Sequence, residues 1–353
     1  MFILLLFIVL CSTLFLSFFE REGTIKYKWT YMIIVIVLCA LAAFRPEDVD
    51  KDYLTYVDYF NNSANIPIDV EPSFEIIVKA IKVFTTDARW LFIFYAFIAI
   101  PLFTYALNKI SVTPHLALAV WISNFYIIHG LTQIRVGVST AFILLGLSYI
   151  IRKKNRLYLL VCILCAIFFH YSAIFYLVLL FISNKEVSKK ELLCWAIIPI
   201  LSISFTLGGI EILDFLPNNS IGKRIEVYHS LNNYGIEKID FFNKPFLLRL
   251  LTYYFLLIKY KLLSTRIKYL PLIIRIYGIS VFLYMAFSFI PTLAIRSSEL
   301  FSIIEILMLP AIIYGVRPRR VGIILVALYI FEVIMVNILY NTNIPNLSNP
   351  FSI

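Results

Sequence analysis

The chain has 353 residues, of which 61% are hydrophobic and only 15% are charged. A soluble globular domain is closer to half apolar and a quarter charged, so the composition excludes an ordinary soluble enzyme. The net charge of +10 does not indicate a nucleic-acid partner, because most Lys and Arg residues lie in short loops between apolar runs.

The apolar runs predict an all-α, polytopic transmembrane helical bundle with about 12 membrane segments. In chain order they lie at 2–19, 29–44, 89–107, 113–129, 131–151, 157–169, 171–183, 192–207, 246–261, 272–290, 298–315 and 321–340. The stretch 157–183 is too long for one ordinary span and short for two. We therefore expect a hairpin of two short, broken helices that dips into the membrane. The first run lacks the basic start and cleavage site of a signal peptide, so we expect a retained helix.

The basic residues predict the topology, because short cytoplasmic loops of membrane proteins are rich in Lys and Arg. Six short loops fit the cytoplasmic side, at 20–28, 108–112, 152–156, 184–191, 259–268 and 317–320. Both termini and two longer loops, 45–88 and 208–245, then lie on the outer side. We find no separate soluble domain in either loop and treat 1–353 as a single integral membrane domain.

The two longer loops differ in character. The first is acidic and contains PSFEIIVKAIKVF, whose apolar residues recur at helical spacing, so we expect an amphipathic helix on the membrane surface. The second contains Gly208-Gly209 and Asn232-Asn233, which are typical of turns.

The chain carries none of the familiar motifs of soluble enzymes. It has no Gly-rich phosphate loop, no nucleophile elbow and no cluster of zinc ligands. Cys162 and Cys165 form a CxxC inside an apolar run with no His or carboxylate nearby in sequence, which favours simple packing. We expect neither a metal nor a cofactor.

Charged and polar side chains near membrane depth are the remaining candidates, because each charge there costs roughly 2.5–3.5 kcal/mol without a partner or a wet cavity. Arg135 begins a helix in GLTQIRVGVSTAF, beside Gln133, where it either binds a phosphate group or extends to the interface. His170, at the tip of the expected hairpin, either acts as a general base, donates a hydrogen bond to a diphosphate, or is an ordinary buried or interfacial histidine.

Two further groups lie where the chain enters or leaves the membrane. Arg296 and Glu299 are candidates for substrate contact, but they could also form only a structural pair at i,i+3 spacing. Arg45, Asp52, Tyr53 and Tyr56 follow the second run and either anchor it in an aromatic belt or bind sugar, with the carboxylate on hydroxyls and the rings on sugar faces.

These residues, in this order, resemble the EpsG-like family, which belongs with the Wzy-type O-antigen and capsule polymerases. The matching positions are Arg45, Asp52-Tyr53-x-x-Tyr56, Glu71-Pro72-x-Phe74, Ile134-Arg135 with Ala141, His170-x-Ser172-Ala173, and Arg296 before a helix ending in Leu309-Pro310. The acidic stretch between Arg45 and Tyr53 departs from the family pattern. The resemblance covers about 40–315.

The resemblance implies a glycosyltransferase of the bacterial inner membrane. Oligosaccharide repeat units arrive at the outer face on undecaprenyl diphosphate, and the growing chain is transferred to the next unit with release of undecaprenyl diphosphate. Under this reading Arg135 and Arg296 bind the diphosphate, and Asp52 or His170 is the base. Arg45, Tyr53, Tyr56, Glu71, Gln133 and Glu299 are then candidate substrate contacts. A flippase and a chain-length regulator of the same pathway are the expected protein partners.

Three other functions compete with polymerisation. A lipid-linked oligosaccharide flippase fits the number of helices, but such carriers often contain two related halves, and we find no internal repeat. An O-antigen ligase would use similar chemistry on a different acceptor. A structural subunit of a polysaccharide export complex is the third alternative.

Overall fold

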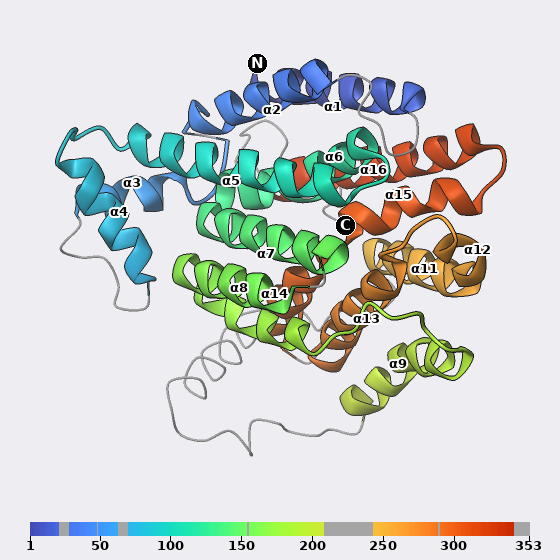
Figure 1. Cartoon of the computed structure of the whole chain (residues 1–353). Helices are drawn as coiled ribbons and strands as arrows, with labels where there is room; N and C mark the ends of the chain where they lie inside the picture. Colours follow the sequence, from blue (N-terminus) through green and yellow to red (C-terminus); the bar gives the residue numbers. More distant parts are fainter. Residues whose placement is uncertain are drawn as a thin grey trace, which may run out of the picture. The chain divides into compact units, whose positions relative to one another are not determined.

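The computed structural model describes residues 1–20, 28–47, 49–62, 70–153, 155–207, 243–288 and 290–341, and within these ranges it contains helices and turns but no strand (Figure 1). The predicted all-α class is therefore confirmed. The predicted outer loop 208–245 falls almost entirely outside the described residues, and so do Asp48 and residues 63–69 of the first loop.

The chain divides into two compact units, Met1–Phe181 with Val316–Ile353, and Ile182–Gly315. The first unit contains α1 (Phe2–Phe19), α2 (Lys28–Ala43), α3 (Tyr53–Asn61), α4 (Pro72–Lys82), α5 (Arg89–Ile110), α6 (Pro114–Trp121), η2 (Ile122–Thr132), α7 (Ile134–Lys153), α8 (Arg156–Phe169), η3 (Tyr171–Leu180) and α16 (Arg319–Asn341). The second contains α9 (Lys189–Leu207), α11 (Lys244–Ile258), α12 (Tyr260–Ser264), α13 (Leu270–Ala286), α14 (Pro291–Ser302) and α15 (Glu305–Gly315).

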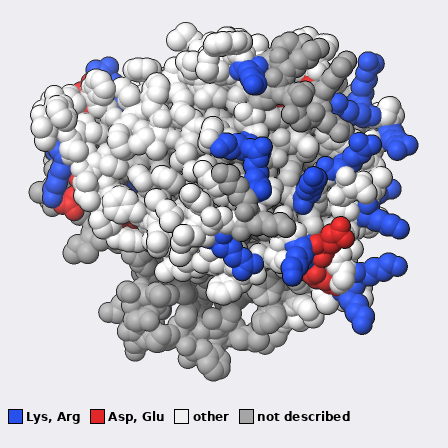
Figure 2. Space-filling view, viewed as in Figure 1, with Lys and Arg blue, Asp and Glu red and all other residues white. Residues whose placement is uncertain are grey.

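Four described helices are long and apolar enough to cross a membrane, namely α1, α5, α7 and α16. The bent pair of α14 and α15 makes a possible fifth span. Several other apolar helices are shorter, so the expected number of about 12 segments is not confirmed. Wide areas of the face in Figure 2 carry neither basic nor acidic side chains, as expected for helices that contact lipid.

The apolar run at 113–129 is not the single regular helix that we expected. It begins as α6 and continues from Ile122 as the π-helix η2. In a π-helix each carbonyl accepts a hydrogen bond from the N–H five residues further on. In addition, the side-chain amide of Asn337 in α16 donates to the Ser123 carbonyl oxygen at 2.7 Å. This run is therefore an interior element of the first unit that is held by polar contacts.

The run at 298–315 was also expected to form one helix, and this was wrong. It breaks between α14 and α15, whose axes are bent by 59°. Serine hydroxyls in α14 donate back to carbonyls of the preceding turn, and Ser302 to Glu299 at 3.0 Å is the last of them before the break. Such back-bonding bends helices. The break places Glu305 at the first position of α15.

The predicted pair of short helices at 157–183 is present as α8 and the 3₁₀-helix η3. His170 joins them in an extended conformation, with φ −155° and ψ 116°. Whether this hairpin dips into the membrane remains a prediction.

The predicted amphipathic helix is α4, and its apolar face packs on protein. Phe74 and Val78 are fully buried in a cluster that includes Tyr56, Phe92 and Tyr95. The opposite face carries the exposed pair of Glu75 and Lys79, which are 2.5 Å apart. This packing holds α3 and α4 against α5 and fixes the residue before α4, Glu71.

Candidate functional site

The carboxylate of Glu71 brings together three of the predicted site residues. Its Oε1 lies 2.8 Å from His170 Nδ1 and accepts a hydrogen bond of 3.1 Å from the Tyr171 backbone N–H. Its Oε2 accepts a hydrogen bond from Arg135 Nη1. Arg135 is 64 positions and His170 is 99 positions further along the chain, so this cluster exists only in the fold.

Each of the three residues stands at the end of a helix. Glu71 is the N-cap of α4, followed by Pro72, whose fixed φ favours the first helical position. Arg135 is the second residue of α7, directly after η2. His170 lies at the break between α8 and η3, where the extended backbone turns its ring toward Glu71. Helix ends position the three side chains more rigidly than loops would.

Burial differs across the cluster in a way that suits a binding site. The side chain of Glu71 is only 3% exposed, whereas those of Arg135 and His170 are 22% and 24% exposed. Glu71 is therefore an internal anchor, and the cation and the imidazole form the accessible part of the cluster.

The protonation state of Glu71 follows from its surroundings. Burial alone would raise the pKa of this carboxyl, but the His170 hydrogen bond and the Arg135 charge outweigh it and lower the pKa to about 2. An ionised carboxylate only accepts hydrogen bonds, so the proton of the His170 ring lies on Nδ1. The Nε2 atom then carries the lone pair, as a general base requires.

Arg135 is held from more than one side. Its guanidinium group interacts electrostatically with Tyr56. The guanidinium carbon lies 6.0 Å from the centre of the Tyr56 ring and 5.7 Å from that of Phe74. Burial raises the pKa of Tyr56, so this hydroxyl stays protonated at neutral pH. The position of the Arg135 charge is therefore well defined before any substrate binds.

Arg45 is buried in the interior rather than facing a substrate. Its Nε pairs with Asp50 at 2.5 Å, and its Nη atoms donate to the carbonyls of Ala42 and Leu131 at 2.9 Å each. Its guanidinium carbon also lies 4.1 Å from the centre of the Phe92 ring. These contacts join the end of α2 to the end of η2, so the structure gives Arg45 a packing role.

The rings of Tyr53 and Tyr56 are buried, although they were candidates for stacking on sugars. Tyr53 stacks on Phe92 with ring centres 4.5 Å apart, and Tyr56 packs against Phe74. Asp52 is the N-cap of α3 and donates its backbone N–H to Asp50 Oδ1 at 3.0 Å. Rings inside a protein cluster do not present a face to a sugar, so Tyr56 is tied to the site only through Arg135.

The remaining candidates lie elsewhere. Gln133 ends η2, where its backbone N–H donates to the Ile128 carbonyl at 2.6 Å. Arg296 and Glu299 belong to α14 of the second unit, Arg296 exposed and Glu299 half-buried. The second unit also contains Arg249, which pairs with Glu305 at 3.0 Å. Our sequence analysis missed Arg249, although a lone arginine in the apolar run FLLRLLTYYFLLI is itself a sign of function.

Within the described residues, no group of three or more His, Cys, Asp or Glu side chains is arranged to hold a metal ion.

Gly137 allows α7 to start close against η2, and this sets the position of Arg135. A Cβ atom at Gly137 would lie 2.1 Å from the His129 carbonyl oxygen, which is backbone and cannot rotate away. We expect Gly137→Ala to displace the start of α7 and to lower both thermal stability and activity. Gly130→Ala is the milder comparison, because its nearest neighbour would be the Tyr126 side chain at 3.2 Å. The melting temperatures of both purified variants check this.

Comparison with known proteins supports the resemblance described above. The model of the EpsG family matches residues 28–351, which is nearly the whole chain and includes the Glu71 cluster. No curated protein and no solved structure gives a significant match. The chain therefore belongs to the EpsG family and is a helical membrane protein of polysaccharide biosynthesis.

Proposed function

We propose that this protein polymerises undecaprenyl-diphosphate-linked oligosaccharide repeat units at the outer face of the bacterial inner membrane. The observation that carries the proposal is the cluster of Glu71, Arg135 and His170, which combines a fixed cation with a base of defined tautomer. Transfer of a sugar from a diphosphate needs a cation that stabilises the leaving diphosphate and a base that accepts the proton of the attacking hydroxyl. The membership in the EpsG family supports the same assignment.

In the proposed reaction, a hydroxyl oxygen of the acceptor unit attacks the anomeric carbon of the growing chain. The bond from that carbon to the diphosphate oxygen breaks, and its electron pair leaves with undecaprenyl diphosphate. The hydroxyl proton passes to His170 Nε2. Because diphosphate is already a good leaving group, the scheme requires no strong acid, no metal and no nucleotide sugar.

The charges of the cluster match this sequence of events. Before reaction the Arg135 cation and the Glu71 anion balance each other, and His170 is neutral. When His170 accepts the proton, the cluster gains one positive charge as the diphosphate gains negative charge. Preorganised groups of this kind stabilise a transition state without having to reorient. Glu71 stabilises the imidazolium as the orienting carboxylate of a catalytic triad does.

The other candidates keep roles consistent with their surroundings. Asp52 remains the alternative base, and we rank it below His170 because His170 has an orienting carboxylate. Arg296, exposed on α14, remains a proposed contact to the diphosphate, and Glu299 and Gln133 remain proposed substrate contacts. Both termini are proposed to face outward. The proposed protein partners are the flippase and the chain-length regulator of the same pathway.

Removal of the Arg135 cation is the direct test of the proposal. In cells that lack the endogenous protein, we expect wild type to restore a long glycan ladder and Arg135→Ala to leave mainly single repeat units. The reason is that the leaving diphosphate loses its fixed counter-charge. Separation of lipid-linked and surface glycans by size measures both outcomes.

The matched control is Arg89→Ala, which removes an exposed arginine that pairs only locally with Asp87. It is expected to restore the ladder. Polymer that accumulates on its lipid carrier in the deleted cells would point to a ligase, and repeat units trapped at the inner face would point to a flippase. A normal ladder with Arg135→Ala would exclude the phosphate-binding role of this residue.

A further inference from the structure

Tyr95, near the start of α5, is a buried tyrosine whose hydroxyl has no hydrogen-bond partner among the described residues. The residue is only 1% exposed. The hydroxyl of a buried tyrosine usually finds a partner, and leaving such a group unpaired destabilises the fold. Phenylalanine would fill the same space without this cost. Packing therefore accounts for the ring of Tyr95 but not for its hydroxyl.

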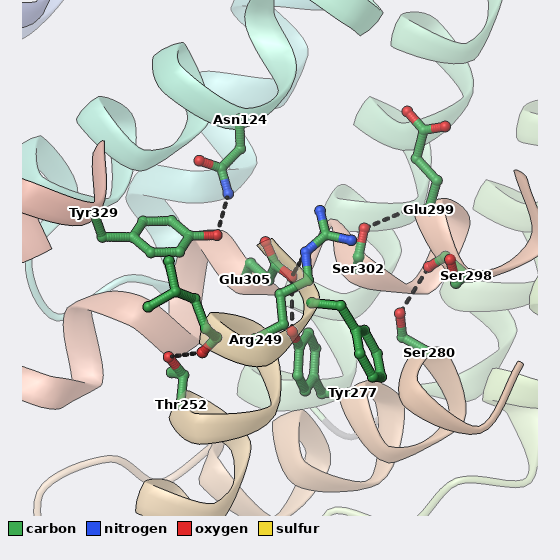
Figure 3. Close-up of polar contacts among 12 residues, drawn as sticks. Asn124, Arg249, Thr252, Tyr277, Ser280, Ser298, Glu299, Ser302, Glu305 and Tyr329 are labelled. Carbon is green, nitrogen blue, oxygen red and sulfur yellow. Dashed lines mark hydrogen bonds and ion pairs between the residues drawn. The ribbon is translucent and has the colours of Figure 1, made fainter. Parts of the chain in front are cut away.

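Other buried tyrosines of the chain use their hydroxyls. Tyr31 of α2 donates to the carbonyl of Thr104 at 3.0 Å. In the second unit, the Tyr277 hydroxyl donates to Glu305 at 2.8 Å, and the same carboxylate pairs with Arg249 at 3.0 Å (Figure 3). A buried carboxylate in this chain therefore holds an arginine and a tyrosine hydroxyl together.

The Tyr95 ring packs beside the cluster that the proposed reaction uses. Its centre lies 6.4 Å from that of Phe74 and 6.4 Å from that of Phe169. The Phe74 ring in turn contacts the guanidinium group of Arg135, and Phe169 directly precedes His170. The Tyr95 side chain is therefore fixed between the two helix ends that carry the cation and the imidazole.

The bonds of Glu71 explain why a hydroxyl close to it would stay unused. The Tyr95 hydroxyl interacts electrostatically with Glu71 and Arg135. Oε1 of the carboxylate is taken by His170 and by the Tyr171 backbone N–H, and Oε2 by Arg135. When Arg135 turns toward a bound phosphate group, Oε2 loses this donor. A carboxylate that is 3% exposed cannot replace the donor with bulk water, so a second donor nearby would lower the cost of the exchange.

We propose that Tyr95 is a positioning residue for the polyprenyl diphosphate, and that its hydroxyl donates to Glu71 Oε2 when Arg135 turns toward the substrate. The substrate class rests on the proposed function. The exchange takes place on binding, before the chemical step. It keeps Glu71 ionised and hydrogen-bonded, so that Glu71 still orients His170 while the donors of Arg135 serve the diphosphate.

The test compares Tyr95→Phe with wild type, both as purified full-length protein. Native mass spectrometry measures binding of undecaprenyl diphosphate and of phosphatidylglycerol. We expect Tyr95→Phe to bind undecaprenyl diphosphate about tenfold to a hundredfold more weakly, because a hydrogen bond to a charged group is lost in the bound state alone. Its melting temperature should not fall, because the hydroxyl has no partner before binding.

Tyr31→Phe is the matched control, and the opposite result is expected. It also removes one buried tyrosine hydroxyl, but this one donates to the Thr104 carbonyl, on α5 like Tyr95. The melting temperature of Tyr31→Phe should fall, and its affinity for undecaprenyl diphosphate should equal that of wild type. The pair of variants thus separates a hydroxyl that serves the fold from one that serves the bound state.

Unchanged affinity in Tyr95→Phe would overturn the inference, as would failure of wild type to bind undecaprenyl diphosphate. A fall in melting temperature as large as that of Tyr31→Phe would also overturn it, since the hydroxyl would then be bonded before binding. Equal weakening of phosphatidylglycerol binding would overturn the assignment to a diphosphate. The glycan ladder restored by wild type in cells tests the proposed polymerase function separately, so that function can stand when this inference fails.

Discussion

Replacing Glu71 with glutamine is expected to lower the rate of polymer elongation by about two to four orders of magnitude, the range that a general base contributes. The substitution is nearly isosteric, but it removes the charge that pairs with Arg135 and orients His170. A glutamine amide that donates to Nδ1 forces the imidazole proton onto Nε2, which then cannot accept the acceptor proton. Elongation in isolated membranes, followed as ladder growth with time, measures the effect.

Glu75→Gln is the matched control for this prediction. It lies one turn further along α4, is exposed, and pairs only with Lys79. The same loss of one negative charge should leave the elongation rate unchanged there, since exposed pairs contribute little. A Glu71→Gln variant with a wild-type rate would mean that the carboxylate serves only to pack α4.

The contact among Glu71, Arg135 and His170 is the part of the site that the sequence could not supply. The resemblance to the EpsG-like family singled out all three residues, but each in its own segment. Arg135 and His170 lie 64 and 99 positions after Glu71 in the sequence, and the packing of α4 and α5 against α7 and α8 brings the three side chains together. No local pattern reports such contacts, because helical periodicity only identifies which face of a helix is buried.

The buried tyrosines show a different limit. Tyr53 and Tyr56 follow an apolar run, and the same composition suits an aromatic belt, a sugar platform or a packed core. The neighbours that decide among these are Phe74 and Phe92, which come from other helices. Aromatic residues are therefore weak predictors of a sugar site unless their exposure is known.

The positions of most helices could be predicted from the sequence, but the π-helical geometry of η2 and the break between α14 and α15 could not. The apolar runs located most helices within a few residues, because runs of apolar residues long enough for a span are an unambiguous pattern. The π-helix η2 and the break before α15 occur together with individual polar contacts, such as Asn337 with the Ser123 carbonyl, that apolar runs do not report. Arg249 was missed for a related reason, since its partner Glu305 lies 56 positions later in the sequence.

Replacing His170 with glutamine is the second change with a large expected effect. The pH dependence of the elongation rate distinguishes His170, the proposed base, from Glu71, the carboxylate that orients it. We expect a loss of about two to four orders of magnitude in elongation rate, as for any general base. Because the pKa of Glu71 is lowered to about 2, this carboxylate stays ionised at every pH that membranes tolerate. A wild-type rate that falls on acidification must then reflect a group other than Glu71.

The residual rate of His170→Gln should therefore not fall on acidification, whereas that of Asp52→Asn should fall as in wild type. Rates measured in isolated membranes between about pH 5 and pH 8 distinguish the two variants. If the acid dependence instead disappeared in Asp52→Asn and persisted in His170→Gln, the base would be Asp52. His170 would then act only as a neutral donor that holds Glu71 in place between α4 and α8.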